Sequence, residues 1–518
     1  MNRRELWIVI SATVLALAPF LAKAFHIDDT VFVRIAEQIL KSPVLPYAFD
    51  YNWSTIPMSV WDLNLNPPLT SYLLAAAFLP FGVSEIAAHL LFLLLAVGSA
   101  ALMFDLARRW CPTPKAAVLA CVLSPSFLVN ATNVMADIPL LFSWLLAVWF
   151  VVLAVERDEP VWLWAAGAAL SCAAMSKYFG LAATPLVAVY WRMKVRRWSL
   201  HDTAFLMPIA VIAAWCLYSY FETGLIHPLS ASRFAAGVER SFGENGAAVL
   251  TYLGGSFLWP VFALPFAVLL DRPRRIACLV VAVVAWLVVG RETGGLVAAH
   301  WMLMTLGGCF LLVSAASSVK KADPETVLLS LWFGGTLFFC VFINWTVNVR
   351  ILLPALFPAT VLAMRGLKDD RLRWVWIPTA AVALFITAAD YGWAGAVAEH
   401  ARKHAKTESG QVHFIGHWGF QYYMEEGGAV ALNYENPKMK AGDRLVMSLN
   451  NTFEPALPSS LRGRLGDAVL VEAVNPLQAA TVDNFYHRAG FYSNAFGVIP
   501  YFIGSARFYD KYRIGAVH

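Results

Sequence analysis

Long runs of apolar residues, nearly free of charge, are the feature that most constrains what this sequence can fold into. They include residues 6–20, 87–104 and 276–289, and the 518-residue chain is 59% hydrophobic and only 14% charged. Soluble proteins carry about 25% charged residues, and such runs are typical of segments that cross the apolar core of a bilayer, about 30 Å thick. Because lipid offers the backbone no hydrogen-bond partners, we expect a polytopic α-helical membrane protein.

The basic residues indicate how the spans are arranged. We divide the apolar runs into about thirteen spans, at 5–24, 84–107, 115–131, 137–155, 160–175, 178–192, 202–221, 249–270, 275–290, 295–315, 326–346, 350–366 and 373–394. With the N-terminus in the cytoplasm, the basic clusters fall in cytoplasmic loops, as the positive-inside rule requires. These clusters include Arg108, Arg109, Lys115, Arg157, Arg192, Lys194, Arg196, Arg197, Arg272, Arg274 and Arg275. The net charge of +5 therefore indicates topology and does not indicate nucleic-acid binding.

This arrangement divides the chain into two predicted domains. Residues 1–397 form the transmembrane domain, in which 25–83 is a long outer loop with a helix at the interface over 67–81. An odd number of spans places residues 398–518 outside, where charge, glycine and proline return. Short β-like stretches at 412–415, 444–449 and 468–474, with a helix at 420–426, predict a small extracytoplasmic α/β domain.

Ionisable residues from several segments gather at the predicted outer face, where each is costly near lipid. Taken singly, each has an ordinary interpretation: the aspartates can cap helices, a lysine can reach the interface, and an arginine can anchor to headgroups. Taken together, carboxylates and cations on one side suit a phosphate ester, with or without a bridging divalent cation. The residues are Asp28, Asp29 and Arg34 after the first span, then Asp137, Lys177 and Arg350.

Five blocks of sequence around these residues resemble a known group of enzymes. The blocks are DDTVFVRIAEQIL, NPPLTSYLLAAAFLPFG, VNATNVMADIPLLF, GAALSCAAMSKYFGL and NVRILLPALFP, in this order over residues 1–366. They are similar to the bacterial protein-mannosyltransferase-like, or lipid A aminoarabinose-transferase-like, glycosyltransferases of the GT-C superfamily. The resemblance implies about thirteen spans, an outer C-terminal domain and a donor sugar linked to a polyprenyl phosphate.

The resemblance also implies roles for individual residues. Asp28 matches the acidic residue closest to the reacting sugar, Asp29 the acidic position beside it, and Asp137 a second acidic position. Lys177 and Arg350 match positions that face the carrier phosphate, and we add Arg34 to them. His227 and Arg233 match a histidine and an arginine of a later outer loop, which are also expected to contact the carrier phosphate. Where relatives often have an acidic and a basic residue before the Pro-Pro pair, this chain has Leu65 and Asn66. The resemblance therefore implies no metal ligand or phosphate contact from that loop.

The predicted function is transfer of a sugar from polyprenyl phosphate to a lipid, glycan or protein acceptor, at the outer face of a bacterial inner membrane. We expect a single displacement with inversion, in which Asp28 or Asp29 acts as general base. Asp28 and Asp137 are the candidate ligands of a divalent cation, Mg²⁺, Mn²⁺, Ca²⁺ or Zn²⁺. The main alternative is a transporter or flippase of a lipid-linked sugar, which would not need a folded outer domain; a non-catalytic carrier-binding relative is the third possibility.

Overall fold

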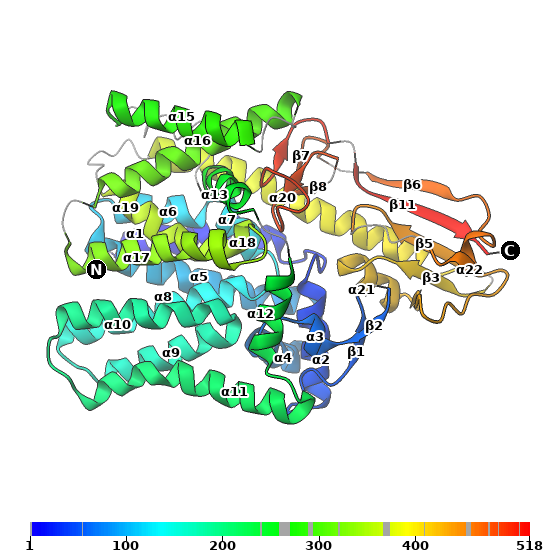
Figure 1. The fold of residues 1–518 in the computed structure, drawn as a ribbon, viewed down its shortest axis with the longest axis horizontal. Helices are drawn as coiled ribbons and strands as arrows, with labels where there is room; N and C mark the ends of the chain where they lie inside the picture. The colour runs from blue at the N-terminus through cyan, green and yellow to red at the C-terminus, as the bar shows by residue number, and fades with distance from the viewer. Residues whose placement is uncertain are drawn as a thin grey trace.

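A helical body and a smaller C-terminal sheet make up the computed structural model of the chain (Figure 1). The structure describes residues 3–53, 55–238, 241–257, 270–288, 294–319, 322–365, 373–408, 410–451, 457–474, 477–484, 486–506 and 508–517. Parts of the predicted spans 249–270, 275–290 and 350–366 lie outside these residues. The long helix α20 (Arg373–His404) leads from the helical body towards the C-terminal sheet.

The first part of the chain is almost entirely helical. Its elements are α1 (Arg3–Leu17), η1 (Ala18–Phe20), α2 (Asp29–Lys41), α3 (Val60–Leu63), α4 (Leu69–Phe81), α5 (Glu85–Trp110), α6 (Pro114–Val122), α7 (Pro125–Ala131), α8 (Asp137–Arg157), α9 (Trp162–Ser176), η2 (Tyr178–Ala182), α10 (Ala183–Lys194), η3 (Leu200–Leu206) and α11 (Met207–Thr223). A hairpin of β1 (Asp50–Asn52) and β2 (Pro57–Ser59) interrupts them. Helix α4 agrees with the helix predicted at 67–81.

The helical body continues after α11 to the start of the C-terminal region. Its elements are α12 (His227–Gly237), α13 (Phe242–Ser256), α15 (Arg272–Val288), α16 (Gly295–Ser317), α17 (Pro324–Phe338), η6 (Phe339–Ile343), α18 (Val349–Leu352), η7 (Leu353–Ala355) and α19 (Leu356–Met364), followed by α20. Helix α20 continues to His404, past the predicted boundary at 397.

The C-terminal region contains a mixed five-stranded sheet with the order β4-β3-β5-β11-β6. Strand β3 (Val412–Ile415) runs parallel to β4 (Val430–Ala431) and β5 (Arg444–Ser448), whereas β11 (Phe508–Ala516) is antiparallel to β5 and β6 (Val469–Val474). Helices α21 (Trp418–Glu426) and α22 (Ser459–Arg462) belong to this region. The strands and the first of these helices lie close to their predicted positions.

Besides the hairpin of β1 and β2, the described residues contain two further pairs of very short strands. Both are in the C-terminal region: β7 (Ala480–Thr481) pairs with β10 (Phe502–Ile503), and β8 (Asp483–Asn484) with β9 (Ala489–Gly490).

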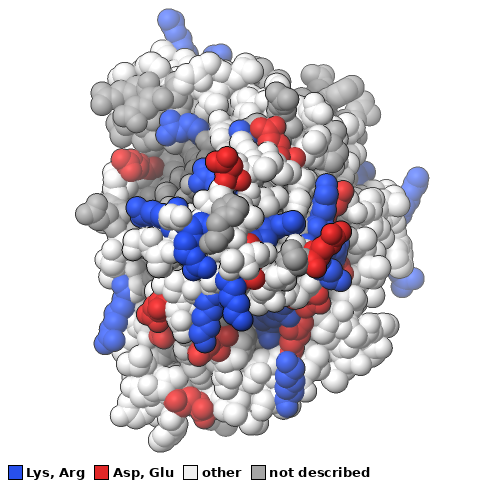
Figure 2. Space-filling model, turned by 90° about the vertical axis from the view of Figure 1, so that its right-hand side faces the viewer, with Lys and Arg blue, Asp and Glu red and all other residues white. Residues whose placement is uncertain are grey.

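The surface on the side of the C-terminal sheet carries both kinds of charge. Figure 2 shows the molecule from the right-hand side of Figure 1, and Lys and Arg are intermixed with Asp and Glu across the middle of this face. A mixed surface of this kind is suited to water.

Six helical segments are long and apolar enough to cross a membrane, judged by length and composition among the described residues. A seventh is added if α6 and α7, bent by 55° at their break, form one span. The segments are Glu85–Trp110, Asp137–Arg157, Leu200–Thr223, Gly295–Ser317, Pro324–Ile343 and Trp376–His404. The chain is therefore an integral membrane protein, whereas the count of about thirteen spans and the orientation stay predictions.

Apolar side chains on the outside of the helical body are consistent with a lipid environment. In the segment Leu200–Thr223 only 22% of the most apolar stretch is buried inside the molecule. Leu217 and Phe221 on α11 and Val280 on α15 are exposed to the surroundings of the protein. Because a large exposed apolar surface marks a membrane or protein contact, these helices are placed to face lipid.

Helices α13 and α16 approach each other closely enough to need glycine at the contact. A Cβ atom at Gly308 would lie 2.0 Å from the carbonyl oxygen of Leu250, and one at Gly254 would lie 1.8 Å from that of Met304. The hydroxyl groups of Thr251 and Thr305 form a hydrogen bond of 2.8 Å across the same interface. Small residues and interhelical hydrogen bonds are the usual means by which helices associate in lipid.

We expect Gly308→Ala to lower the thermal stability of the purified protein, because the added methyl group would push α13 and α16 apart. The matched control is Gly334→Ala on α17, where a Cβ atom meets nothing within 4 Å. Alanine there removes the helix penalty of glycine, about 1 kcal/mol, so stability should be unchanged or slightly raised. Equal melting temperatures for the two variants would contradict this account of the interface.

Candidate functional site

Asp28 and Arg350 form the first acid–base pair of the site. Asp28 directly precedes α2, and Arg350 lies in the short helix α18. A guanidinium nitrogen of Arg350 donates to Asp28 Oδ2 over 2.9 Å, although the two residues are 322 positions apart. Asp28 occupies the N-cap position of α2, but its side chain makes no capping hydrogen bond. The carboxylate is therefore directed to the arginine, and the simple capping interpretation does not describe it.

Asp137 and Lys177 form the second pair. The Lys177 ammonium group donates to Asp137 Oδ1 over 2.6 Å. Asp137 is the first residue of α8, where the helix dipole favours a carboxylate, and Lys177 lies in the break between α9 and η2. The break is tight, because a Cβ atom at Gly180 would lie 2.2 Å from the carbonyl oxygen of Ala173. This glycine lets the chain fold back and present Lys177 to Asp137.

The two pairs belong to one electrostatic system. Arg350 also interacts through its charge with Asp137. Among the described residues, Asp137 Oδ2 and Arg350 Nε are buried atoms without a hydrogen-bond partner. Buried polar atoms are nearly always satisfied, so this acceptor and this donor beside the two ion pairs can each make one further hydrogen bond.

Asp29 lies beside Asp28 but has a different environment. It is fully buried, and its two carboxyl oxygens accept the backbone N–H groups of His26 (2.9 Å) and Val134 (2.7 Å). Burial raises the pKa of Asp29 to about 7, against the opposing effects of Lys23 and the two N–H donors. Asp28, whose side chain is 35% exposed, is the more accessible of the two carboxyl groups.

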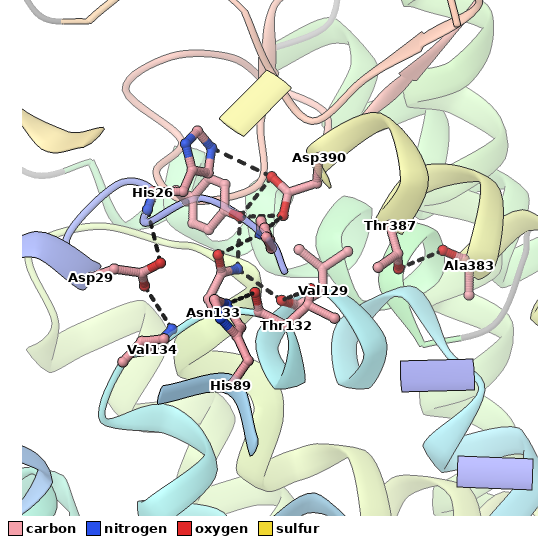
Figure 3. Close-up of polar contacts among 12 residues, drawn as sticks. His26, Asp29, His89, Val129, Thr132, Asn133, Val134, Ala383, Thr387 and Asp390 are labelled. Atoms are coloured by element: carbon pink, nitrogen blue, oxygen red, sulfur yellow. Dashed lines mark hydrogen bonds and ion pairs between the residues drawn. The ribbon is translucent and has the colours of Figure 1, made fainter. Parts of the chain in front are cut away.

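Lys23 and Asp390 form a buried ion pair near these residues, and neither was among the predicted site residues. Figure 3 shows the side of this network formed by His26, Asn133 and Asp390. The ammonium group of Lys23 is paired with Asp390, and both side chains are completely buried. Lys23 also donates to Asn133 Oδ1 (2.7 Å), and the Tyr492 hydroxyl lies 2.8 Å from Asp390 Oδ1. Burial, with the charge of Lys23, holds the pKa of His26 well below its usual value, so the ring is neutral.

Arg34 lies away from both pairs. Its guanidinium group is paired with Glu37 (2.9 Å), Glu425 (3.0 Å) and Glu426 (3.3 Å), and it stacks over the ring of Tyr422 at 4.5 Å. Three of these residues belong to α21, so Arg34 joins α2 to the C-terminal region. Its charge is balanced by glutamates, and the predicted contact with a carrier phosphate stays a prediction.

His227 and Arg233 are both on α12 but in different surroundings. His227 is buried, and its ring nitrogens lie 2.8 Å from the Asn64 carbonyl oxygen and 2.5 Å from the Tyr178 hydroxyl. Tyr178 follows Lys177 directly, so the histidine is close to the second pair, whereas Arg233 is exposed on the surface. The predicted phosphate-binding roles of both residues remain untested by this geometry.

The candidate metal ligands are Asp28 and Asp137. Each already has a basic partner, Arg350 and Lys177 respectively. Within the part of the chain that the structure describes, no group of three His, Cys, Asp or Glu residues is placed to hold a metal ion. These two carboxylates therefore do not by themselves form a complete ligand set.

A comparison with family models finds a match over part of the chain. Residues 65–220 match the family described as dolichyl-phosphate-mannose-protein mannosyltransferase. The matched segment contains Asp137 and Lys177, whereas Asp28 and Arg350 lie outside it. The predicted resemblance to polyprenyl-phosphate-dependent glycosyltransferases is confirmed by this match, and the predicted enzyme class, a glycosyltransferase, is confirmed with it. No curated protein matches the chain significantly.

Several solved structures are similar to the chain at low sequence identity. ArnT from Cupriavidus metallidurans bound to undecaprenyl phosphate is 14% identical with a TM-score of 0.45, over 86% of this chain and 92% of that one. The Archaeoglobus fulgidus oligosaccharyltransferase in complex with Zn and sulfate is 13% identical with a TM-score of 0.40, over 82% and 62%. The S. cerevisiae Pmt1-Pmt2 complex bound to the sugar donor is 18% identical with a TM-score of 0.32, over 43% and 34%.

We expect Asp390→Ala to destabilise the protein by about 3–5 kcal/mol, because it leaves the buried Lys23 ammonium group without its counter-charge. The double variant Lys23→Met with Asp390→Leu should recover much of this loss, since two apolar side chains of similar size need no partner. Thermal unfolding of the purified variants measures both effects. A double variant that is no more stable than Asp390→Ala would contradict the account.

The raised pKa of Asp29 predicts a pH dependence of stability. Between pH about 4 and 7 the folded protein keeps the Asp29 proton while the unfolded chain has lost it, so stability falls as the pH rises. The slope from one proton is about 1.4 kcal/mol per pH unit. We expect Asp29→Asn, which cannot ionise, to remove this slope in thermal unfolding measured from pH 4 to 8. Identical slopes in the two proteins would contradict the assignment.

Proposed function

We propose that this protein transfers a sugar from a polyprenyl-phosphate carrier to a hydroxyl group of a lipid, glycan or protein acceptor at the outer face of the membrane. The observation that carries the proposal is the meeting of the two pairs, Asp28–Arg350 and Asp137–Lys177, from four distant segments. Their unpaired Asp137 Oδ2 and Arg350 Nε atoms suit a ligand with phosphate and hydroxyl groups. The family match over residues 65–220 supports the same donor class.

The ion pairs imply an exchange of partners when the donor binds. Without substrate, Arg350 and Lys177 each neutralise a carboxylate, which keeps the charges paired in an apolar environment. A carrier phosphate brings its own negative charge and competes for both cations, and the fork of an arginine suits two phosphate oxygens. Donor binding thereby releases Asp28 from Arg350, so that a free carboxylate becomes available at the moment when it is needed.

The chemical step then follows from the released groups. The acceptor hydroxyl oxygen attacks the anomeric carbon of the sugar and passes its proton to the Asp28 carboxylate. The bond between that carbon and the phosphate oxygen breaks, and its electrons leave with the polyprenyl phosphate. Arg350 and Lys177 stabilise the charge that develops on the leaving phosphate, and such fixed charges are usually the largest catalytic contribution. One displacement at the anomeric carbon inverts its configuration.

The remaining carboxyl groups have supporting roles in this mechanism. Asp29, held by two backbone N–H groups, fixes the start of α2 and thus the direction of Asp28. Asp137 holds Lys177 in place before the donor binds. If the reaction requires Mg²⁺, Mn²⁺, Ca²⁺ or Zn²⁺, Asp28 and Asp137 are the carboxylates available to it.

We expect Asp28→Asn to lower the transfer rate by about 10²–10⁴-fold, the usual contribution of a general base. The same change should tighten the binding of the donor, because Arg350 loses its internal competitor. Turnover and equilibrium binding of undecaprenyl phosphate, measured on the same preparation, separate the two effects. Weaker donor binding in Asp28→Asn would contradict the exchange of partners.

The function itself is tested by transfer from radiolabelled undecaprenyl-phosphate monosaccharides in proteoliposomes, with wild type, Asp28→Asn and an arm containing EDTA. Carrier-dependent transfer that is lost in Asp28→Asn is the expected result. Loss in EDTA, with recovery on adding one of the four cations, would assign a metal to the reaction. Sugar that crosses the bilayer still attached to its lipid, with Asp28 irrelevant, would replace the transferase by a transporter.

A further inference from the structure

Residues 491–494 of the C-terminal region return to the helical body and lie against residues 346–349, at the start of the short helix α18 that carries Arg350. The backbone N–H of Val349 donates to the Phe491 carbonyl oxygen (3.1 Å), and that of Asn494 donates to the Val347 carbonyl oxygen (2.9 Å). The residue before Arg350 is thus held by the backbone of a segment more than a hundred positions further along the chain. Such contacts fix the position of the arginine's own backbone.

Side chains that are buried (Thr346, Ser493) or half-buried (Asn494) strengthen the same contact. Asn494 Oδ1 accepts the backbone N–H of Val347 (3.1 Å) and the hydroxyl group of Thr346 (2.6 Å). The hydroxyl groups of Thr346 and Ser493 are 3.0 Å apart. Because a buried polar group is costly unless it is satisfied, this set of contacts favours one relative position of the two segments.

Tyr492 joins this segment to the charged groups on both sides of it. Its ring lies 5.9 Å from the guanidinium carbon of Arg350. Its hydroxyl group lies 2.8 Å from Asp390 Oδ1 and accepts a hydrogen bond of 2.8 Å from the Asn133 amide. One side chain therefore lies beside Arg350 and also forms a hydrogen bond with the buried ion pair.

The segment is itself anchored to the helical body. The hydroxyl group of Tyr252 on α13 lies 2.7 Å from the Gly490 carbonyl oxygen and 2.9 Å from that of Gly497. A Cβ atom at Gly497 would lie 1.8 Å from the carbonyl oxygen of Arg488, so the segment closes tightly on itself. It is a folded segment of the C-terminal region that is bound to the helical body through α13.

We propose that residues 491–494 position Arg350 for the carrier phosphate, so that the C-terminal region forms part of the donor site. This inference rests on the proposed function, because it takes Arg350 as a phosphate ligand. Tyr492 and Asn494 are positioning residues: they act through Arg350 and need not touch the donor. The C-terminal region thereby contributes to donor affinity in addition to any part it has in acceptor binding.

A double-mutant cycle tests this role on the full-length protein. The measured quantity is its affinity for undecaprenyl phosphate alone, which requires neither sugar nor acceptor. Asn494→Ala and Tyr492→Leu should each weaken binding by about tenfold in the presence of Arg350, and have almost no effect in an Arg350→Ala background, because residues that act through one another are not additive. Tyr492→Phe, which keeps the ring beside Arg350, should bind nearly as wild type.

The matched control is Tyr501→Leu, which removes a buried tyrosine whose hydroxyl donates to the Gly255 carbonyl oxygen (2.6 Å) of α13. Its effect on binding should be the same with and without Arg350. If Asn494→Ala or Tyr492→Leu weakens binding to the same extent with and without Arg350, or has no effect on binding, the positioning role is overturned and the proposed function stands. If Arg350→Ala itself leaves the affinity unchanged, the phosphate role of Arg350 fails, and this inference fails with it. Thr346→Val removes the hydroxyl group that donates to Asn494 Oδ1, and it should weaken binding less than Asn494→Ala and only when Arg350 is present.

Discussion

Lys23 and Asp390 form an ion pair that is completely removed from solvent, and the arrangement of the segments around it depends on this pair. Neither charge can be left alone in an apolar interior, since the cost of desolvating a single ion is several kcal/mol. The pair therefore fixes the end of the first helical segment against α20. Asn133 and Tyr492 complete its hydrogen bonds and bring α7 and the C-terminal segment to the same point.

The functional groups follow from this arrangement. Val134, the neighbour of Asn133, holds Asp29, and Tyr492 lies beside Arg350. The site is thus assembled from charges that are already paired before any substrate arrives, and in the proposed mechanism the donor exchanges one partner for another, so that no charge is left alone in an apolar environment. Asp28 and Asp137 each have a basic partner, Arg350 and Lys177, because an unpaired charge is costly in surroundings of low polarity.

Sequence reasoning singled out the residues of the two ion pairs and did not predict the completely buried pair of Lys23 and Asp390. Asp28, Asp137, Lys177 and Arg350 stood out because each breaks the charge pattern at the end of an apolar run, and the structure brings them together as two pairs. Asp390 had a signal too, since it is an acidic residue inside the predicted span 373–394. Its partner Lys23 was seen only as the end of the first run, and Tyr492 has no sequence signature, because only folding brings it to them. Arg34 is paired with glutamates, two of them on α21, and its predicted contact with a carrier phosphate stays a prediction. Helices and strands were predictable from periodicity, but the number of spans was not, because several apolar runs form helices too short to decide by length.

The contact of residues 491–494 with the Arg350 loop has a consequence for how the protein is made. A nascent chain that has emerged only as far as α20 contains Asp390 without Tyr492, and an Arg350 loop whose backbone groups lack their partners. Residues 346–349 therefore receive their last partners only when residues 491–494 have been made, so the surroundings of Arg350 are complete only late in synthesis of the chain.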